Sequence, residues 1–195
     1  MRKRWLALGV SVVGVAVALY VTAPRKLDPG FLVDPVADGR IAGNGERGEL
    51  MFAAAGCGSC HSAEETDALA GGNAFVSDFG TFYAPNISTD VVHGIGSWSD
   101  YDIANAMLAG VSPNGSHYYP AFPYTTYSNM TAQDAVDIIA HLRTLPADAT
   151  PSRDHNVGFP FNIRRALGGW KFLFASDDWV ATNTPTPEIE RGRYL

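Results

Sequence analysis

The feature that most constrains this chain is the five-residue motif Cys57-Gly58-Ser59-Cys60-His61. Its two cysteines are the only ones in the sequence, so no disulfide framework exists beyond this pair. The spacing Cys-x-x-Cys-His is the signature of covalent haem attachment, in which both thiols form thioethers and the adjacent imidazole binds the iron. We therefore expect one covalent haem c on Cys57 and Cys60, with His61 as an iron ligand.

Two other kinds of site also use paired cysteines. A thiol-disulfide oxidoreductase places its Cys-x-x-Cys at a helix start within a βαβ unit, and no such pattern surrounds Cys57. A structural zinc site needs four ligands, and the sequence has no second Cys-x-x-Cys. Haem is the leading interpretation, and the redox dithiol and the zinc site are the alternatives.

An uncharged apolar run at residues 5–23 follows three basic residues at positions 2–4. Its length is roughly one bilayer span, and the basic flank favours a cytoplasmic N-terminus. We expect residues 1–23 to form a transmembrane anchor that contacts lipid through residues 5–23. The protein would then be a single-pass protein of the inner membrane with its haem domain in the periplasm. The alternative is a signal peptide cleaved after Ala23, although the run exceeds the roughly 7 to 15 residues of a signal-peptide core.

The rest of the chain divides by composition. Residues 24–45 are rich in proline and glycine and show no apolar period, which predicts a flexible linker. Residues 46–146 form the expected haem domain. Residues 147–195 form a C-terminal extension in which aromatic residues alternate with cations, as in a segment that packs on the domain or lies among lipid headgroups.

Three short helices are expected around the haem. Asn44, Ser99 and Thr131 have the side chains of helix N-caps, while Gly110 and Pro146 end the second and third helices. The expected helices cover residues 45–55, 100–109 and 132–145. Loops as long as those between them are uncommon in a small domain unless they have a function, and a large cofactor supplies one. The sequence therefore predicts an all-α domain of three short helices and long loops around haem.

The ends of this domain resemble those of class I cytochromes c, through Gly48, the motif at 57–61 and a last helix ending His141-Leu142-Arg143-Thr144-Leu145. A closer similarity covers roughly residues 56–174 and is carried by Pro85-Asn86-Ile87, Gly94-Ile95-Gly96-Ser97-Trp98-Ser99, Tyr119-Pro120-Ala121-Phe122-Pro123-Tyr124 and Met130-Thr131. This part resembles bacterial membrane-associated cytochrome c subunits of periplasmic dehydrogenases, including alcohol dehydrogenase cytochrome subunits. These subunits often carry two haems.

The resemblance implies a sixth iron ligand. Class I domains usually supply a methionine from the loop before the last helix, which makes Met130 the candidate and His61 with Met130 the metal ligands. In the alcohol dehydrogenase subunits the ligand resembles a methionine at the position that Phe122 holds here. Ligation by a histidine, with His117 as the main rival, and an open sixth position are the alternatives.

Further cofactor-binding residues follow from the same resemblance. Pro85 matches a proline whose carbonyl accepts a hydrogen bond from the ligand histidine, here His61. Trp98, Tyr118 and Tyr124 would reach the haem propionates, and ordinary aromatic packing is the alternative for these three side chains.

The resemblance implies an electron carrier, not an enzyme. Electrons would pass in a periplasmic respiratory chain between a quinol- or substrate-oxidising complex and an oxidase or other acceptor, with a respiratory complex or dehydrogenase in the same membrane as partner. The chain has 20 acidic residues against 14 Lys and Arg, which disfavours nucleic acid and favours a basic docking surface on the partner. The alternatives are a haem enzyme or gas sensor with an open sixth site, and a structural subunit of a respiratory supercomplex.

The C-terminal extension contains a segment whose pattern repeats that at the start of the haem domain. Glu46-Arg47-Gly48-Glu49-Leu50 opens the haem domain, and Glu190-Arg191-Gly192-Arg193-Tyr194-Leu195 has a similar pattern. In the family such a segment often begins a second haem domain. We therefore expect that this sequence derives from a two-haem architecture, in which the extension leads to a second haem domain that is missing here.

Overall fold

The computed structural model describes residues 2–62, 68–176, 178 and 185–194. Its helices are α1 (Arg2–Val21), α2 (Pro29–Ala37), α3 (Gly45–Ala54), α4 (Cys57–His61), α5 (Asp100–Ala104), the π-helix η1 (Asn105–Ala109), α6 (Tyr124–Tyr127), α7 (Ala132–Leu142), the 3-10 helix η2 (Arg164–Ala166), α8 (Leu167–Phe174) and α9 (Pro187–Tyr194). Its strands are β1 (Ala74–Ser77), β2 (Gly80–Tyr83) and β3 (Asn156–Val157). Residues 63–67 of the predicted loop after the haem motif, and Leu195 of the repeat, lie outside the described residues.

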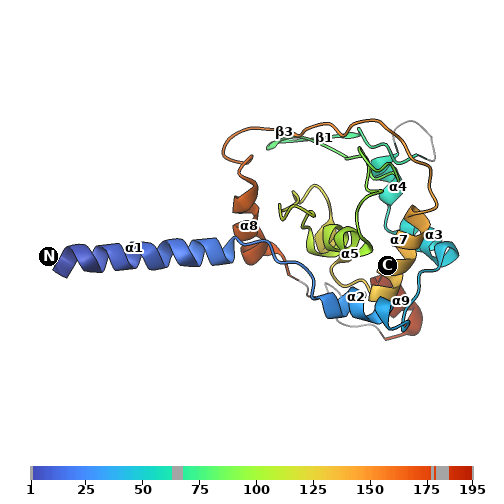
Figure 1. Cartoon of the computed structure of the whole chain (residues 1–195), viewed down its shortest axis with the longest axis horizontal. Coiled ribbons are helices and arrows are strands. Elements are labelled where there is room, and N and C mark those ends of the chain that lie inside the picture. The colour runs from blue at the N-terminus through green and yellow to red at the C-terminus, as the bar shows by residue number, and fades with distance from the viewer. Residues whose placement is uncertain (1, 63–67, 177, 179–184, 195) are drawn as a thin grey trace.

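Helices α3 and α7 pack closely against each other because Gly48 carries no side chain. A methyl group on Gly48 would lie 1.9 Å from the carbonyl oxygen of Asp137, so the two backbones touch. Ile138, Ile139 and Leu142 of α7 are buried in the hydrophobic core that this packing creates. Figure 1 shows the pair at one side of the domain, next to α4.

The predicted helix starts are confirmed by their caps. The Asn44 side chain accepts from the backbone amide of Arg47, and Thr131 does the same for Asp134 at the start of α7. Ser99 caps α5 through the amide of Asp102. The second predicted helix is split into α5 and the π-helix η1, which Gly110 ends in the left-handed conformation with φ at 58°.

A small sheet departs from the all-α prediction. β1 pairs with β2 in an antiparallel hairpin with Ala74 opposite Tyr83, and β2 pairs with β3 with Gly80 opposite Val157. The hairpin strands are four residues long, and β3 comes from the C-terminal extension. Such short strands show no usable alternation in the sequence, and the pairing of β2 with β3 is non-local.

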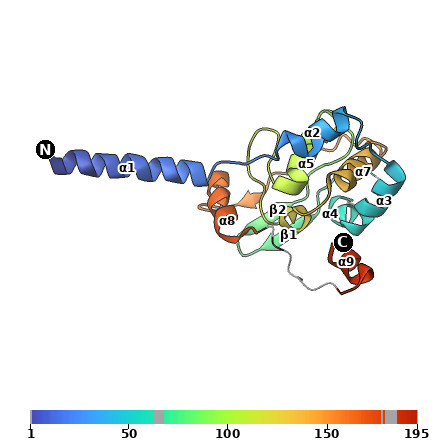
Figure 2. The same ribbon diagram turned by 90° about the horizontal axis from the view of Figure 1, so that it is seen from below.

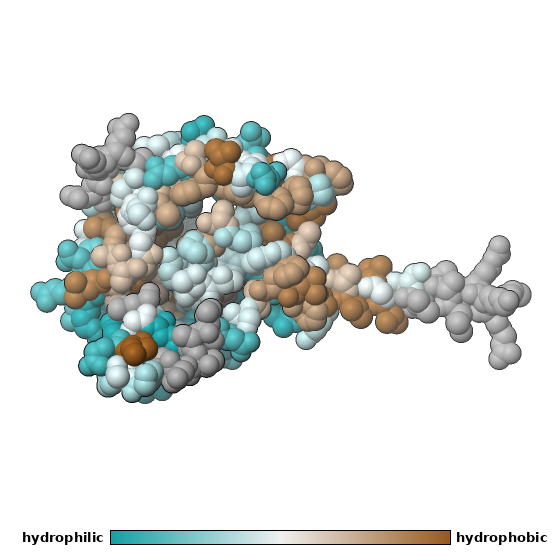
Figure 3. Space-filling view, turned by 180° about the vertical axis from the view of Figure 1, so that it is seen from behind, coloured by the Kyte–Doolittle hydropathy of each residue, from teal (hydrophilic) through white to brown (hydrophobic). Residues whose placement is uncertain are grey.

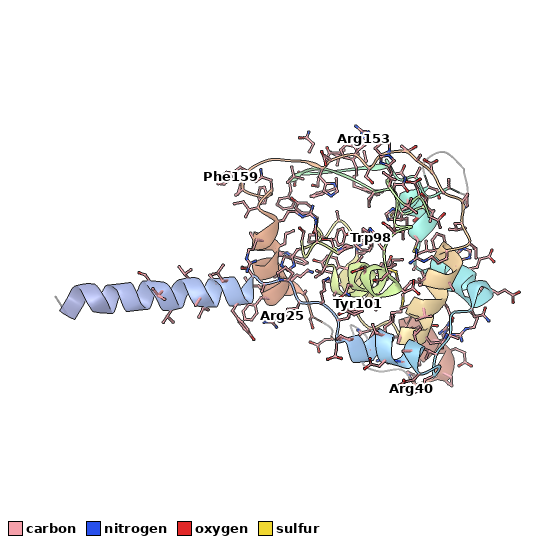
Figure 4. The ribbon with its side chains drawn as sticks, in the orientation of Figure 1. Arg25, Arg40, Trp98, Tyr101, Arg153 and Phe159 are labelled. Atoms are coloured by element: carbon pink, nitrogen blue, oxygen red, sulfur yellow. The ribbon has the colours of Figure 1, made fainter. Side chains whose placement is uncertain are left out.

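The segment 24–45 has more structure than the expected flexible linker. Asp28 caps α2, and the α2 residue Leu32 is 2% exposed within the core. The amide of Leu27 donates to the side-chain oxygen of Asn105 at 2.7 Å. The hydroxyl of Tyr101 donates to the carbonyl of Leu27, so this segment is attached to α5 and η1 along part of its length (Figure 4).

Helix α1 extends away from the domain, and α8 packs beside its C-terminal end (Figures 1 and 2). The helix stops at Val21, before the predicted end of the apolar run. In the described part of the chain, no helix has the length and apolar character needed to cross a membrane. The predictions of an N-terminal transmembrane helix and of a single-pass inner-membrane protein are therefore wrong.

Candidate haem site

The three residues of the motif that carry chemistry lie on one helical turn. α4 begins after Gly56, which adopts the left-handed conformation with φ at 70°. Positions three and four apart on a helix share a face, so Cys57, Cys60 and His61 project to the same side of α4. The space-filling view shows openings between the sheet and the helices below it (Figure 3).

The imidazole of His61 is held by a backbone carbonyl. Its Nδ1 lies 2.8 Å from the carbonyl oxygen of Pro85, so Nδ1 is the nitrogen that carries the hydrogen and Nε2 remains for a metal. Burial lowers the pKa of His61, and the hydrogen bond to Pro85 opposes this in part. The ring is therefore neutral near pH 7, as iron ligation requires.

Two residues that the sequence analysis missed hold this arrangement together. The amide of Gly71 donates to the carbonyl of His61 at 2.8 Å, and a methyl group on Gly71 would lie 2.4 Å from the Pro85 carbonyl oxygen. The side-chain amide of Asn73 donates to the carbonyls of Cys60 and Ser62 at 2.8 and 3.1 Å. The available signal was the Gly-Gly turn followed by an asparagine at the start of a hairpin.

Residues of the C-terminal extension hold the loop that carries Pro85. The side-chain amide of Asn86 donates to the carbonyls of Asp148 and Thr150, each at 2.8 Å. The backbone amide of Asn86 donates to the hydroxyl of Ser152 at 2.9 Å. The beginning of the extension therefore belongs structurally to the candidate site.

Cys57 has the wrong acidity for the nucleophile of a reactive dithiol. Burial raises the pKa of the Cys57 thiol to about 11, with a smaller contribution in the same direction from Cys60. Thiol-disulfide oxidoreductases depend on a thiol whose pKa is lowered. This environment disfavours the redox alternative and is compatible with thiols that become thioethers.

A cluster of aromatic side chains reaches the haem motif through Tyr127. The hydroxyl of Tyr127 donates to the carbonyl of Ala55 at 2.6 Å, and burial raises the pKa of Tyr127 to about 12, with both motif cysteines adding to the rise. The ring of Phe122 lies 6.2 Å from Tyr127, 5.7 Å from Tyr118 and 6.3 Å from Tyr124. Phe122 thus connects the three tyrosines into one cluster.

Tyr124 shows that the residues present fit a polar group of a bound cofactor. Its side chain is 3% exposed, and its buried hydroxyl has no hydrogen-bond partner among the described residues. Buried hydroxyls are normally paired, so this one suits an acceptor such as a haem propionate. Trp98, the third predicted propionate contact, is partly buried against the core beside α5 (Figure 4), and its backbone carbonyl accepts from Arg143 at 2.6 Å.

Met130 lies in a different neighbourhood from His61. It lines a cavity of about 90 Å³ between α3, α6 and α9, together with Met51, Tyr127 and Tyr194. The cavity adjoins the haem motif through Ala55, which precedes α4. The structure thus connects Met130 to the motif through Ala55 and Tyr127.

Three of the four other histidines make contacts away from the haem motif. His117 is 2% exposed, and its Nε2 lies 3.1 Å from the carbonyl oxygen of Thr22 at the end of α1. His141 packs against the ring of Phe52 with 5.1 Å between centroids. The Nδ1 of His155 accepts a backbone hydrogen bond at 3.1 Å. These contacts engage only one ring nitrogen of His117 and of His155. The buried Nδ1 of His117 has no hydrogen-bond partner among the described residues, so His117 stays the main rival of Met130.

Comparison with known proteins agrees with a haem site at this motif. The family model described as Cytochrome c matches residues 45–146. A "Diheme cytochrome c-type" protein of Cereibacter sphaeroides is 43% identical over 200 residues, which cover 99% of this chain and 66% of that protein. The cytochrome c subunit of an alcohol dehydrogenase (quinone) from Gluconacetobacter polyoxogenes is 32% identical over 164 residues, 83% of this chain and 34% of the subunit.

A third relative is the gluconate 2-dehydrogenase cytochrome c subunit of Pantoea cypripedii, 34% identical over 155 residues. The match covers 77% of this chain and 35% of that subunit. The chain therefore spans about two thirds of the diheme relative and about a third of the two dehydrogenase subunits.

Proposed function

We propose, on the premise that this chain belongs to the cytochrome c family, that it holds one covalent haem c and transfers single electrons between proteins. The observation that carries the proposal is the shared face of Cys57, Cys60 and His61, with the His61 ring fixed by the Pro85 carbonyl. When bound, haem supplies the one-electron couple. The protein supplies position, a neutral ligand and exclusion of water.

Each residue has a separate part in this function. Cys57 and Cys60 provide the two thioether sulfurs, and His61 presents Nε2 to the iron. Pro85 keeps Nδ1 protonated and fixes the orientation of the ring, which keeps the ligand field constant. Asn73 holds the backbone of the motif, so the attachment points do not move when an electron arrives.

We propose Met130 as the sixth ligand. It is the methionine that precedes α7, and its cavity adjoins the motif through Ala55 and Tyr127. Met ligation gives the oxidised protein a weak absorption band near the red end of the visible range. Met51 lines the same cavity and provides the matched control.

The spectrum of the oxidised protein tests this ligand. Met130→Leu should abolish the band, whereas Met51→Leu should keep it. A band that survives in Met130→Leu contradicts the assignment. A wild-type protein that lacks the band and binds carbon monoxide when reduced would favour an enzyme or sensor with an open sixth site.

We propose a dehydrogenase as the electron donor and a respiratory chain as the setting. Two relatives are named as cytochrome c subunits of dehydrogenases, which supports a donor of this class. The formal net charge of −6 favours a partner with a basic docking surface. Reduction of the haem-loaded chain by such a dehydrogenase should slow as salt is raised, since screening weakens attraction between exposed charges. A dehydrogenase preparation that leaves the haem oxidised at low salt would contradict this donor class.

A further inference from the structure

Lys171 of α8 inserts its ammonium group into the haem domain. Its Nζ donates to the carbonyls of Ala109 and Gly110 at 2.7 and 2.8 Å, where η1 ends. The same Nζ lies 4.4 Å from the ring centroid of Tyr124, a cation–π contact. Lys171 lies beyond the residues that the family model matches, so it is a contribution of the extension to this domain.

Gly110 packs against the same tyrosine. A methyl group on Gly110 would lie 2.6 Å from the Tyr124 ring, and its φ of 58° is a conformation that glycine adopts readily. Tyr124 is thus held by Gly110 and Lys171 while its buried hydroxyl lacks a partner in the described residues. A fixed ring with an unpaired hydroxyl indicates that its partner is a bound group.

Two contacts between aromatic rings connect Tyr124 toward the haem motif. The Tyr124 and Phe122 centroids are 6.3 Å apart, and the Phe122 and Tyr127 centroids are 6.2 Å apart. Tyr127 in turn donates to Ala55, just before α4. A haem propionate bound by the unpaired Tyr124 hydroxyl would therefore lie one aromatic ring away from the Lys171 ammonium.

The charge of Lys171 is not neutralised by a carboxylate. The groups around it are Tyr124 of α6, His117 of the loop before α6, and the cations Arg164 and Arg165 of η2. Burial lowers the pKa of His117, and the positive charges of Lys171, Arg165 and Arg164 lower it further. Within the described residues, no salt bridge joins Lys171 to an acidic side chain. Burial lowers the pKa of Lys171 to about 8. A nearby negative charge would favour its protonated form.

We propose that Lys171 is a tuning residue of the haem site, whose ammonium stabilises the reduced state and whose amine takes up a proton when the electron arrives. This inference rests on the proposed function. The dehydrogenase donor supplies one electron to the iron, water supplies one proton to the amine of Lys171, and reoxidation releases both. The reduction potential therefore falls as pH rises through the range in which Lys171 loses its proton.

The test uses the haem-loaded full chain and three variants. Haem content is established first by intact mass and absorbance. At pH 7, Lys171→Met should lower the equilibrium constant for reduction about tenfold, the order of magnitude that Coulomb's law gives for a unit charge near a redox centre at an effective dielectric constant of about 20. That is about 59 mV for a one-electron couple. Lys171→Arg should retain the wild-type potential, and so should Lys26→Met, which removes a surface charge paired with Asp102.

The pH profile supplies a second readout that needs no variant. The wild-type potential should be level below about pH 7 and fall above about pH 8, whereas the profile of Lys171→Arg should stay level. A haem-loaded wild type with a level profile overturns the inference even if Lys171→Met fails to fold. So does an unchanged potential in haem-loaded Lys171→Met. A wild type without covalent haem overturns the proposed function instead.

Discussion

The Nδ1 of His61 lies 2.8 Å from the carbonyl oxygen of Pro85, 24 residues along the chain. This contact joins the haem motif to the loop after β2, and Asn73 joins the same motif to the start of β1. The hairpin therefore connects two supports of one short helix. The geometry of α4 depends on residues that the motif does not include.

Asn73→Ala should destabilise the haem-loaded protein. The substitution removes two hydrogen bonds to partly buried carbonyls of α4 and its C-cap, which is expected to cost about 1 to 2 kcal/mol of unfolding free energy. Urea unfolding measures the loss as a lower midpoint. Asn162→Ala, at an exposed asparagine, is the control, and equal midpoints for the two variants would contradict the support role of Asn73.

Gly48→Ala should separate α3 from α7. The new methyl group would overlap the carbonyl of Asp137, and overpacking of this kind costs about 2 to 3 kcal/mol. Gly45→Ala lies in the same helix with no atom within 4 Å of the new methyl group, and should leave stability unchanged or raise it by up to about 1 kcal/mol. Thermal unfolding of both variants separates the packing effect from helix propensity. Similar melting temperatures would contradict the close packing at Gly48.

Arg47→Met should destabilise the protein, because Arg47 is the ion-pair partner of two buried carboxylates. Arg47 lies 3.0 Å from Asp134 and 3.3 Å from Asp137, whose side chain is fully buried. Removing the cation leaves these charges without their ion-pair partner, which is expected to cost about 2 kcal/mol or more. Arg40→Met is the matched control, because Arg40 pairs with Asp38 at the surface, where ion pairs contribute little. Chemical denaturation should give a much lower free energy of unfolding for Arg47→Met than for Arg40→Met. The reverse order would contradict the stabilising role of the Arg47 ion pairs.

Local signals in the sequence predicted the helices well. Caps such as Asn44 and Thr131 act within one turn, so a single sequence reveals them. The family and the class I fold of the haem domain were also predicted, and the match to residues 45–146 confirms them. Features that depend on contacts between distant residues were not predicted. The pairing of β2 with β3 and the attachment of Leu27 to Asn105 are made by residues far apart in the chain.

The prediction of a membrane span for the N-terminal run was wrong. Hydropathy counts residues up to Ala23, whereas the helix ends at Val21, and the described helix does not meet the requirement for a membrane span. The supports at Gly71 and Asn73 were missed because a glycine or an asparagine in a loop reveals nothing about the carbonyl it will contact. The predicted roles of Trp98, Tyr118 and Met130 toward haem stay predictions until the loaded protein is measured.

The central claim is a single haem attached through Cys57 and Cys60, and the intact mass of the denatured chain after maturation tests it most directly. The account predicts a mass increase of one haem that survives acid and organic extraction. It also predicts that a Cys57→Ser, Cys60→Ser double variant loses this increase while keeping the chain mass otherwise as encoded. Haem that is extracted from the wild type, or a wild-type chain whose mass shows a disulfide and no haem, would contradict the account.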